Sequence, residues 1–500
     1  MAGGSSEVQR FYKDCGVFVT GGTGFLGKLT IEKILRSCPD VRKVYVLIRP
    51  KKGLSIEERK KALLDNVVFD RMKREQPDSV DKIVFVAGDC SSPRLGLSDS
   101  DYHHLTQHVH IVLHLAATVR FDETMKVAIN TNIKGTMETV RLCWDCFSLK
   151  AAVFVTTAFS NVNCKEVREE FYEPPMQLEE VLALMDRVSE QELEILSHKV
   201  TGARKIPYLF SKAVMENLIM MHAKGLPVAI VRPSMVVSAV REPLPGWLDN
   251  MYGPISIVTG VGTGVLRVNN ADIDLVLDLV PADMVTNCIL SVASTMSMSS
   301  RSNDAITIYN VVTSDKNPIT IRLLKETMLK YGDKFPLKTV IWHPFMLSVP
   351  NFKLYTFLTL FLHVLPGCLL DLVLRLKGKP PMLLKIYKKI RKYSIIMNMF
   401  PVKQITFFSD NLQNLYEKLG SEDKKLFFFD MKQINWVDSM LTVCLESRKY
   451  LLNETLDDLE LARSRYRRLY IVHTFVKYLL FGLAIYAAWL VIAYFTNSMF

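Results

Sequence analysis

The chain has 500 residues, which is enough for two or three domains with a sizeable core. Its formal net charge of +11 suits anionic ligands such as phosphates, or an anionic membrane face. No basic stripe interleaved with aromatic residues occurs, so we expect no nucleic acid partner. The 9 cysteines are odd in number and lack a framework spacing, which predicts reduced cytosolic thiols and no metal site.

The N-terminal residues 1–14, MAGGSSEVQRFYKD, lack the apolar region of a secretory signal. We therefore expect an N-terminal arm there.

A glycine-rich stretch, VTGGTGFLGK, joins a short apolar run at residues 17–19 to helical apolar spacing at 29–37. Gly21 permits a tight turn, Gly24 lets a diphosphate approach the backbone, and Gly27 lets helix and strand pack closely. The diphosphate would lie on free N–H groups at the positive end of the helix. The candidate contacts are Gly21, Thr23, Gly24, Phe25, Leu26 and Gly27.

Strand-like and helical segments alternate from residue 15 to about residue 240. The strand-like runs are 17–19, 44–48, 83–86, 111–115, 152–155 and 228–231, and helical spacing occurs near 29–37, 126–147 and 207–223. Continuous apolar runs indicate strands covered on both faces, so the pattern predicts an α/β fold with a doubly wound parallel sheet of Rossmann type. From 240 to 350 we expect loops and short strands that cover the substrate end, which completes a domain over 15–350.

A basic cluster follows the second predicted strand: Arg49, Pro50, Lys51 and Lys52. An acidic residue there would bind the ribose of NAD, whereas a basic cluster suits a 2′-phosphate, which predicts NADPH with Arg49 as the main contact and Lys51 as a further one. Asp89, after the third strand, is placed to meet the adenine, and Ala116 follows the fourth strand beside the cofactor.

The segment PYLFSKAVME places Tyr208 and Lys212 four residues apart, on one face of a helix. An ammonium near a phenol favours the phenolate, so we expect Lys212 to lower the pKa of Tyr208 toward working pH.

A third catalytic group should polarise the substrate oxygen from the end of the preceding strand, VFVTTAFS. We expect Thr157 in this role, with Thr156 and Ser160 as alternatives, because side chains alternate along a strand. Asn132 is a candidate for fixing a helix or a proton-relay water.

The C-terminal third is the most apolar part of the chain. LYTFLTLFLHVLPGCLLDLVLRL, from residue 354, contains His363, Pro366 and Asp371, which favour an interfacial or buried helical hairpin over a spanning helix. A basic cluster follows it and would face anionic lipid or solvent. Residues 351–460 are expected to form a helical domain.

Residues 478–500 carry no charge, and Arg463, Arg465, Arg467, Arg468 and Lys477 precede them. This pattern predicts a single C-terminal membrane anchor within 470–500 with the catalytic body in the cytosol. Because basic residues precede the span and none follows, we expect the endoplasmic reticulum rather than the peroxisome.

Several motifs together resemble the extended short-chain dehydrogenase/reductases, and more narrowly the alcohol-forming fatty acyl-CoA reductases of animals. They are TGGTGFLG, VLIRPKKG, HLAATVRFDE, INTNIKGT, FVTTAFSN, YLFSK and VRPS, with LHVLPGCLLDLVLRLKGKPPMLLKIYKKI and FFFDMKQINWVDSM in the C-terminal part. The resemblance implies NADPH-dependent reduction of a long-chain acyl-CoA to a fatty alcohol and CoA by two hydride transfers through an aldehyde. It implies that Tyr208 donates the proton, Lys212 holds the nicotinamide ribose and Thr157 bonds the carbonyl oxygen.

The chain departs from that family in having Thr156-Thr-Ala-Phe159 where Ser-Thr-Ala-Tyr is usual. Membrane lipid is an expected partner, and a homodimer is left open. Arg232 is a candidate for the CoA phosphates. The alternatives are a 3β-hydroxysteroid dehydrogenase-like sterol oxidoreductase, an aldehyde-stopping acyl-CoA reductase and a non-catalytic cofactor sensor.

Overall fold

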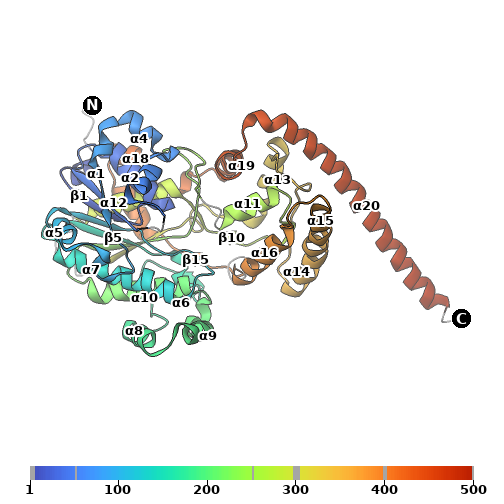
Figure 1. The fold of residues 1–500 in the computed structure, drawn as a ribbon, viewed down its shortest axis with the longest axis horizontal. Coiled ribbons are helices and arrows are strands. Elements are labelled where there is room, and N and C mark those ends of the chain that lie inside the picture. Colours follow the sequence, from blue (N-terminus) through green and yellow to red (C-terminus); the bar gives the residue numbers. More distant parts are fainter. Residues whose placement is uncertain (1–5, 51–52, 250–252, 297–304, 398–401, 498–500) are drawn as a thin grey trace. The chain divides into compact units, whose positions relative to one another are not determined.

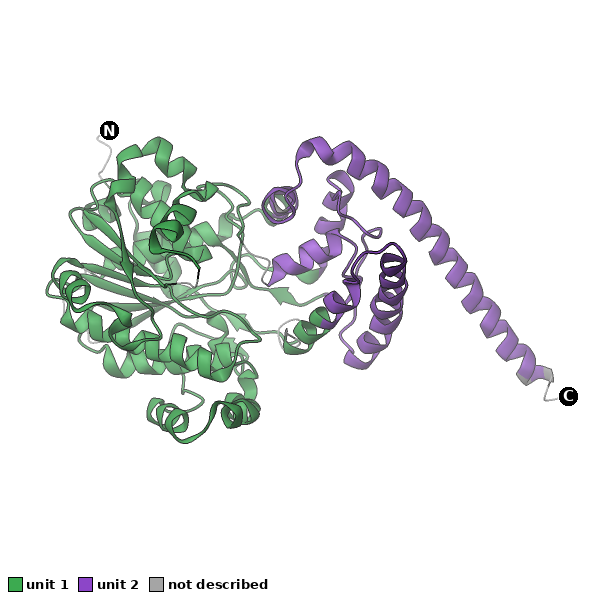
Figure 2. Ribbon diagram, in the orientation of Figure 1, with its two compact units in different colours: residues 1–250, 274–321, 389–439 green, residues 251–273, 322–388, 440–500 purple. Residues whose placement is uncertain are grey.

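The computed structural model describes residues 6–50, 53–249, 253–296, 305–397 and 402–497 (Figure 1). Its contacts divide the chain into two compact units (Figure 2). Unit 1 comprises residues 1–250, 274–321 and 389–439, and unit 2 comprises 251–273, 322–388 and 440–500. The two units therefore draw on interleaved segments of the chain.

Unit 1 is built on a seven-stranded sheet with the order β12-β7-β5-β4-β1-β2-β3, in which neighbouring strands run parallel. The strands are β1 Gly16–Thr20, β2 Lys43–Ile48, β3 Ile83–Ala87, β4 Ile111–His114, β5 Ala151–Val155, β7 Val228–Pro233 and β12 Thr307–Val311. All six strands expected from the apolar runs are present, and the predicted parallel Rossmann-type sheet is confirmed. The seventh strand, β12, lies at the sheet edge and was missed because the polar Asn310 interrupts the apolar run.

Helices cover both faces of this sheet (Figure 1). On one face α2 (Phe25–Ser37) packs against α12 (Ala282–Thr295), and on the other α7 (Gly135–Asp145) packs against α10 (Pro207–His222). This two-sided cover is the doubly wound arrangement, and it explains why every residue of β1 and β5 is buried.

Shorter helices complete unit 1: α1 Glu7–Tyr12, α3 Ile56–Leu64, α4 Asp70–Glu75, α5 Asp99–His108, α6 Met125–Ala128, α8 Leu178–Arg187, α9 Glu190–Thr201, α17 Asp410–Lys418 and α18 Ser421–Leu426. Helix α1 lies within the expected N-terminal arm and packs against α12 with Val8 and Tyr12 buried. Between α6 and α7 one π-helical segment, Ile129–Lys134, interrupts the α-helix.

The segment from 240 to 350 contains the expected short strands, β9 Val268–Asn269, β10 Val276–Leu277, β11 Leu279–Pro281, β13 Ile319–Thr320 and β14 Leu347–Ser348. It also contains three helices that were not expected: α11 Pro254–Gly262, α12 and α13 Ile321–Lys334. Of these, α12 was missed because it is buried on nearly all sides. A helix buried all round carries apolar and small residues at every position, so its sequence shows no amphipathic period.

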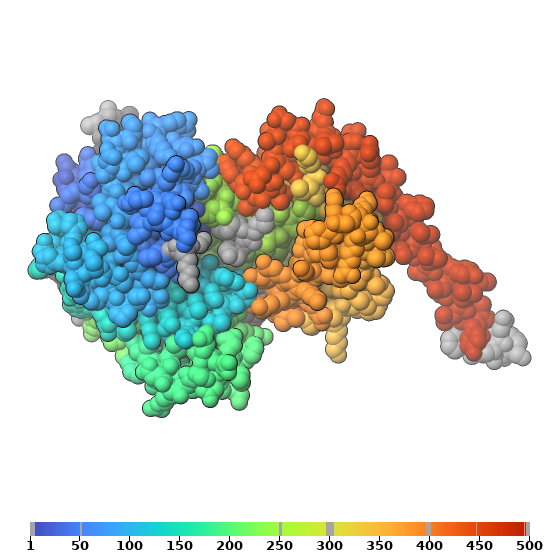
Figure 3. Space-filling model, in the orientation of Figure 1, coloured from blue at the N-terminus to red at the C-terminus, as the bar shows by residue number. Residues whose placement is uncertain are grey.

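Unit 2 is largely helical. Its elements include α14 Phe352–Thr359, a π-helical segment Leu360–Val364, α15 Leu365–Leu376 and α20 Leu459–Asn497, while α16 Leu383–Met397 and α19 Trp436–Leu452 each belong partly to both units. Two helical stretches are long and apolar enough to cross a membrane, Phe352–Leu376 and Leu456–Tyr494. The C-terminal part of α20 forms the red column that extends from the rest of unit 2 in Figure 3.

Candidate active site

The glycine turn after β1 leaves room for a ligand at the start of α2. Gly21 has a φ of +71°, and a Cβ there would lie 2.6 Å from the Ala116 nitrogen. A Cβ on Gly27 would lie 2.1 Å from the Gly21 oxygen, so neither position accepts a side chain without a backbone shift. Gly24 caps α2 without a side-chain hydrogen bond, which leaves the first N–H groups of the helix to a ligand.

This turn lies where the strand order reverses, between β1 and β4. Thr20 ends β1 beside His114, the last residue of β4, with 2.9 Å between Oγ1 and Nδ1. The Ala116 N–H donates to the same Thr20 oxygen at 3.3 Å, which holds the two strand ends together. Burial, with a smaller contribution from the Lys212 charge, lowers the pKa of His114 to about 3. His114 is therefore a neutral structural residue beneath the site.

The end of β2 carries the expected basic residue. The Arg49 side chain is 70% exposed, and its Nε lies 4.0 Å from Oδ2 of Asp89. The other Asp89 oxygen accepts hydrogen bonds from the backbone and hydroxyl of Ser91, at 3.0 and 2.8 Å. Lys51 lies outside the described residues.

A second guanidinium, that of Arg59 on α3, lies near Arg49. Burial and then the positive charge of Arg49 lower the pKa of Arg59. Its Nη1 is buried and has no hydrogen-bond partner among the described residues. An unpartnered guanidinium N–H that feels the charge of Arg49 fits a doubly charged phosphate. The sequence analysis missed Arg59 because it considered only the residues directly after the strand.

Tyr208 and Lys212 lie on the first turns of α10, below the carboxyl end of β5. The Thr157 hydroxyl donates to the Pro233 carbonyl at 3.3 Å. Burial raises the pKa of Tyr208 to about 12, and the neighbouring Thr157 hydroxyl offsets this only in part. The Lys212 ammonium donates to the Val155 carbonyl at 2.8 Å, and burial lowers the pKa of Lys212 to about 7. The structure thus brings Thr157, Tyr208 and Lys212 to one end of β5.

The expected lowering of the Tyr208 pKa by Lys212 is wrong for this arrangement. The ammonium is held by the Val155 carbonyl and lies 3.4 Å from the Met215 sulfur, while desolvation dominates at the phenol. The phenol therefore stays protonated at neutral pH.

The three candidate hydroxyls differ in what they contact. Thr157 donates to the Pro233 carbonyl at 3.3 Å and lies beside the Tyr208 phenol, whose pKa it lowers. Thr156 donates to Glu216 at 2.7 Å, and Ser160 donates to the Thr157 carbonyl at 2.9 Å and to Glu216 at 3.4 Å. Of the three, Thr157 is the one that faces the phenol.

Comparison with known proteins now bears on this site. Two family models, both described as male sterility protein, match residues 19–289 and 362–454. Over 482 residues the chain is 38% identical to fatty acyl-CoA reductase wat of Drosophila melanogaster, covering 96% of this chain and 93% of that one. The chain belongs to the fatty acyl-CoA reductase family. Fatty acyl-CoA reductase 1 of Gallus gallus is 32% identical over 463 residues, covering 93% of this reductase and 90% of the relative.

The fold of the reductase is shared more widely. The reductase domain of a nonribosomal peptide synthetase from Mycobacterium tuberculosis superimposes with a TM-score of 0.57 at 17% identity, covering 88% of this chain and 95% of that one. The chain is thus an oxidoreductase with a nicotinamide-dinucleotide-binding fold.

A buried ion pair in the reductase lies behind Thr157. The Glu216 carboxylate accepts hydrogen bonds from Nε and Nη2 of Arg232 at 2.9 and 2.7 Å. Arg232 also donates to the backbone carbonyls of Arg168 and Glu170. Because Arg232 is fully buried and engaged in this way, the idea that it meets CoA phosphates is wrong. Glu216 was missed, although a carboxylate on the apolar face of α10 signals a buried partner.

Asn132 lies in the π-helical segment and is fully buried. Its side-chain amide donates to the Ser211 hydroxyl at 2.9 Å and to the Thr118 carbonyl at 3.3 Å. Its oxygen accepts from the Thr118 N–H at 3.0 Å. Asn132 therefore ties α10, one residue before Lys212, to the loop after β4.

Phe159, the departure from the usual family motif, packs in an apolar cluster with its ring edge-on to Phe407 at 5.1 Å. A tyrosine hydroxyl would have to find a partner in these surroundings, so phenylalanine suits this environment.

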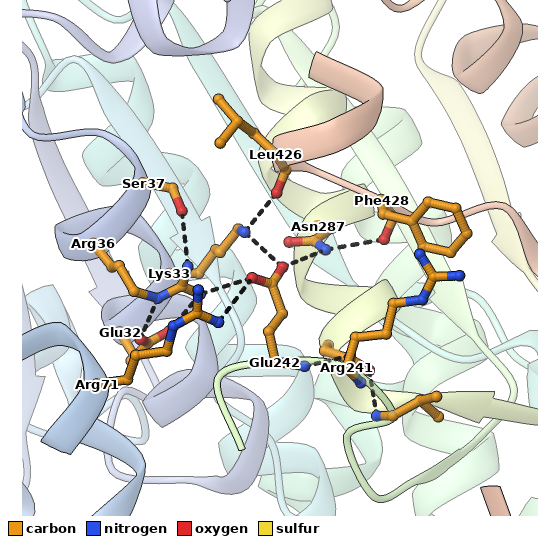
Figure 4. A network of polar contacts seen from close by, with 12 residues as sticks. Glu32, Lys33, Arg36, Ser37, Arg71, Arg241, Glu242, Asn287, Leu426 and Phe428 are labelled. Carbon is orange, nitrogen blue, oxygen red and sulfur yellow. Dashed lines mark hydrogen bonds and ion pairs between the residues drawn. The ribbon is translucent and has the colours of Figure 1, made fainter. Parts of the chain in front are cut away.

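A buried polar network holds α2 of the reductase in place (Figure 4). Glu242 accepts from Lys33 at 2.5 Å, from Arg36 at 2.9 Å and from the Asn287 amide at 2.9 Å. These cations lower the pKa of Glu242 to about 2 against its burial. The loop that carries Glu242 also places Trp247 on Phe25, with ring centroids 5.2 Å apart. The stacking on Phe25 and the contacts of Glu242 thus hold α2 in place.

Proposed function

We propose that this reductase converts a long-chain acyl-CoA, two NADPH and two protons to the fatty alcohol, CoA and two NADP⁺, through an aldehyde. The observation that carries the proposal is that Thr157, Tyr208 and Lys212 lie together at the carboxyl end of β5. The names of the curated relatives, fatty acyl-CoA reductases, favour this substrate over a sterol.

The residues between β1 and β4, where the strand order reverses, fit a dinucleotide. The turn at Gly21 and Gly27 has no room for side chains, the start of α2 would hold the diphosphate, and Arg49 with Arg59 would hold a 2′-phosphate. Lys212 would bond the nicotinamide ribose. When bound, the reduced nicotinamide supplies a hydride to the substrate carbonyl carbon.

Tyr208 is the general acid in this proposal. Because its pKa lies near 12, the phenol is protonated at neutral pH and can give its proton to the oxygen of the reduced thioester carbon, which is more basic still. Thr157, beside that phenol, would donate to the same oxygen by exchanging its hydrogen bond to the Pro233 carbonyl. Collapse of the resulting hemithioacetal breaks the C–S bond and releases the CoA thiol. The aldehyde left behind is reduced and protonated in the same way.

The test is product analysis with purified protein, NADPH and hexadecanoyl-CoA. We expect hexadecanol and two NADPH consumed per CoA released. Hexadecanal with one NADPH consumed would instead show the aldehyde-stopping enzyme. No thioester-dependent NADPH consumption, together with NAD-dependent oxidation of a 3β-hydroxysteroid, would contradict the proposal.

Arg59→Ala is expected to raise KM for NADPH about 10- to 100-fold, because a charge-assisted hydrogen bond contributes about 1.5–3 kcal/mol. KM for NADH should not change, since NADH lacks the 2′-phosphate. Steady-state kinetics with both cofactors measure this, with Lys61→Ala on the same helix as the matched control. An equal rise for both cofactors would show that Arg59 acts on the fold rather than on the phosphate.

For localisation, we propose that the apolar part of α20 spans the endoplasmic reticulum membrane with the catalytic body in the cytosol. Five basic residues precede the apolar stretch, which favours the cytosolic side for them, and this stretch is fully exposed in the structure.

Ending the chain after Lys477 is expected to make the protein extractable from membranes by alkaline carbonate. The shortened α20 keeps its packing, because Tyr466, Tyr470 and His473 contact His343 within unit 2. Immunoblotting of pellet and supernatant against the full chain measures the change. If the shortened protein resists carbonate as the full chain does, α20 is not the anchor.

A further inference from the structure

The helical stretch of residues 352–376 in unit 2 has its polarity reversed relative to a helix of a soluble domain. Its buried residues recur every four positions and are mostly polar or small: Tyr355, Thr359, His363, Gly367 and Asp371. In a soluble protein the buried stripe would be apolar and the solvent side polar.

The buried stripe is joined to its own unit by specific contacts. His363 Nε2 accepts from the Arg267 N–H at 2.9 Å, and its ring stacks on Tyr387 at 4.9 Å with 10° between the planes. Asp371 accepts from the N–H groups of residues 382, 383 and 384 and so caps the start of α16. Gly367 lies against the Tyr387 ring, where a Cβ would come within 2.9 Å. This face is therefore the one that packs on protein.

The opposite face is apolar and uncovered. Ten large apolar side chains on it are between 41% and 79% exposed: Phe352, Leu354, Phe357, Leu360, Phe361, Leu365, Leu369, Leu372, Val373 and Leu376. Soluble proteins rarely leave so large a contiguous apolar surface in water. The apolar face thus needs a partner of its own.

The charge around this face identifies the partner. Within unit 2, residues 352–388 contain six basic residues and a single acidic one, the buried Asp371. The basic residues are Lys353, Arg375, Lys377, Lys379, Lys385 and Lys388. An apolar face with a basic border matches acyl chains beneath anionic headgroups.

Two other partners fit less well. A second copy of this chain would bring its own basic border against the first and face like-charge repulsion. A bilayer crossed by the whole stretch would have to enclose His363 and Asp371, whose contacts keep one side of the helix on protein.

We propose that this apolar face, residues 352–376, lies in the headgroup and upper acyl layer of an anionic membrane leaflet, as a membrane contact separate from α20. The contact does not depend on the proposed reaction, and its test reads only the lipid environment of the helix.

A native thiol reports on this face. Cys368 is the exposed cysteine among the described residues, and it lies on the apolar side of α15. The full chain, labelled at Cys368 with an environment-sensitive dye, is reconstituted into vesicles of phosphatidylcholine with phosphatidylglycerol, with Cys368→Ser as the labelling control.

We expect a blue-shifted emission that lipids brominated near the headgroup quench more strongly than lipids brominated near the bilayer centre. Stronger quenching from the bilayer centre would overturn the interfacial placement. A blue shift without lipid quenching would show a protein partner, and emission as in water would show that the face is solvated. Either result would also overturn the proposal.

Charge reversal separates lipid charge from hydrophobic contact. Lys377→Glu with Lys379→Glu should lower the partition of the labelled helix between the vesicle surface and water. The expected decrease is about five-fold or more for each charge removed, because a basic residue near an anionic surface contributes about that factor. The matched control, Lys199→Glu with Lys425→Glu, reverses two exposed lysines of unit 1 and should leave the quenching unchanged. Equal effects of the two pairs, or none of either, would contradict an anionic leaflet as the partner.

Discussion

Tyr208→Phe is expected to lower kcat for acyl-CoA reduction about 10²- to 10⁴-fold, the usual contribution of a positioned general acid. The phenol is the proton donor in the proposed reaction, and it lies beside Thr157 rather than in the turn that would hold the cofactor. NADPH affinity should therefore persist. Stopped-flow or steady-state rates give kcat, and fluorescence titration gives the Kd for NADPH.

The control for this variant is Tyr102→Phe, which also removes one hydroxyl, the donor to Asp145 at 2.6 Å on α7. Thr157→Val should lower kcat, and Thr157→Ser should restore most of it because the hydroxyl returns. If Tyr208→Phe leaves kcat near the unchanged value, the phenol is not the acid and the mechanism must change.

Glu216→Gln is expected to lower the free energy of unfolding by about 3–5 kcal/mol, the cost of leaving one partner of a buried ion pair without the other. Arg232 would keep its charge in a fully buried position with only two carbonyls and an amide oxygen to receive it. Thr156 and Ser160 would lose a charged acceptor at the same time. Denaturant unfolding of the detergent-solubilised chain, followed by tryptophan fluorescence, measures the change.

The matched control is Glu166→Gln, which breaks an ion pair with Arg168 whose side chains are 58% and 53% exposed. An exposed pair contributes about 0–1 kcal/mol, so this variant should unfold almost as the unchanged protein does. Similar losses for both variants would mean that the pair of Glu216 and Arg232 has no special role in stability.

Strands and the glycine turn were predictable because their signals are local. A strand covered on both faces reads as an unbroken apolar run, and β1, β2 and β5 lie where those runs predicted. The edge strand β12 and the buried helix α12 were not predictable. Helix α12 has no amphipathic period because it is buried nearly throughout, and β12 has no unbroken apolar run.

The sequence by itself determined the parallel sheet, the nucleotide-binding turn and the pairing of Tyr208 with Lys212 on one helix face, because these follow from spacing of two, three or four residues along the backbone. Only the tertiary structure decided that Thr157 rather than Thr156 faces Tyr208. It alone also decided that Glu216 forms an ion pair with Arg232, and that the Arg49 charge acts on Arg59. It also decided which side of residues 352–376 is covered. Those outcomes depend on side chains that meet across different elements, and on burial, which raises the pKa of Tyr208 where its spacing from Lys212 had suggested a lower one.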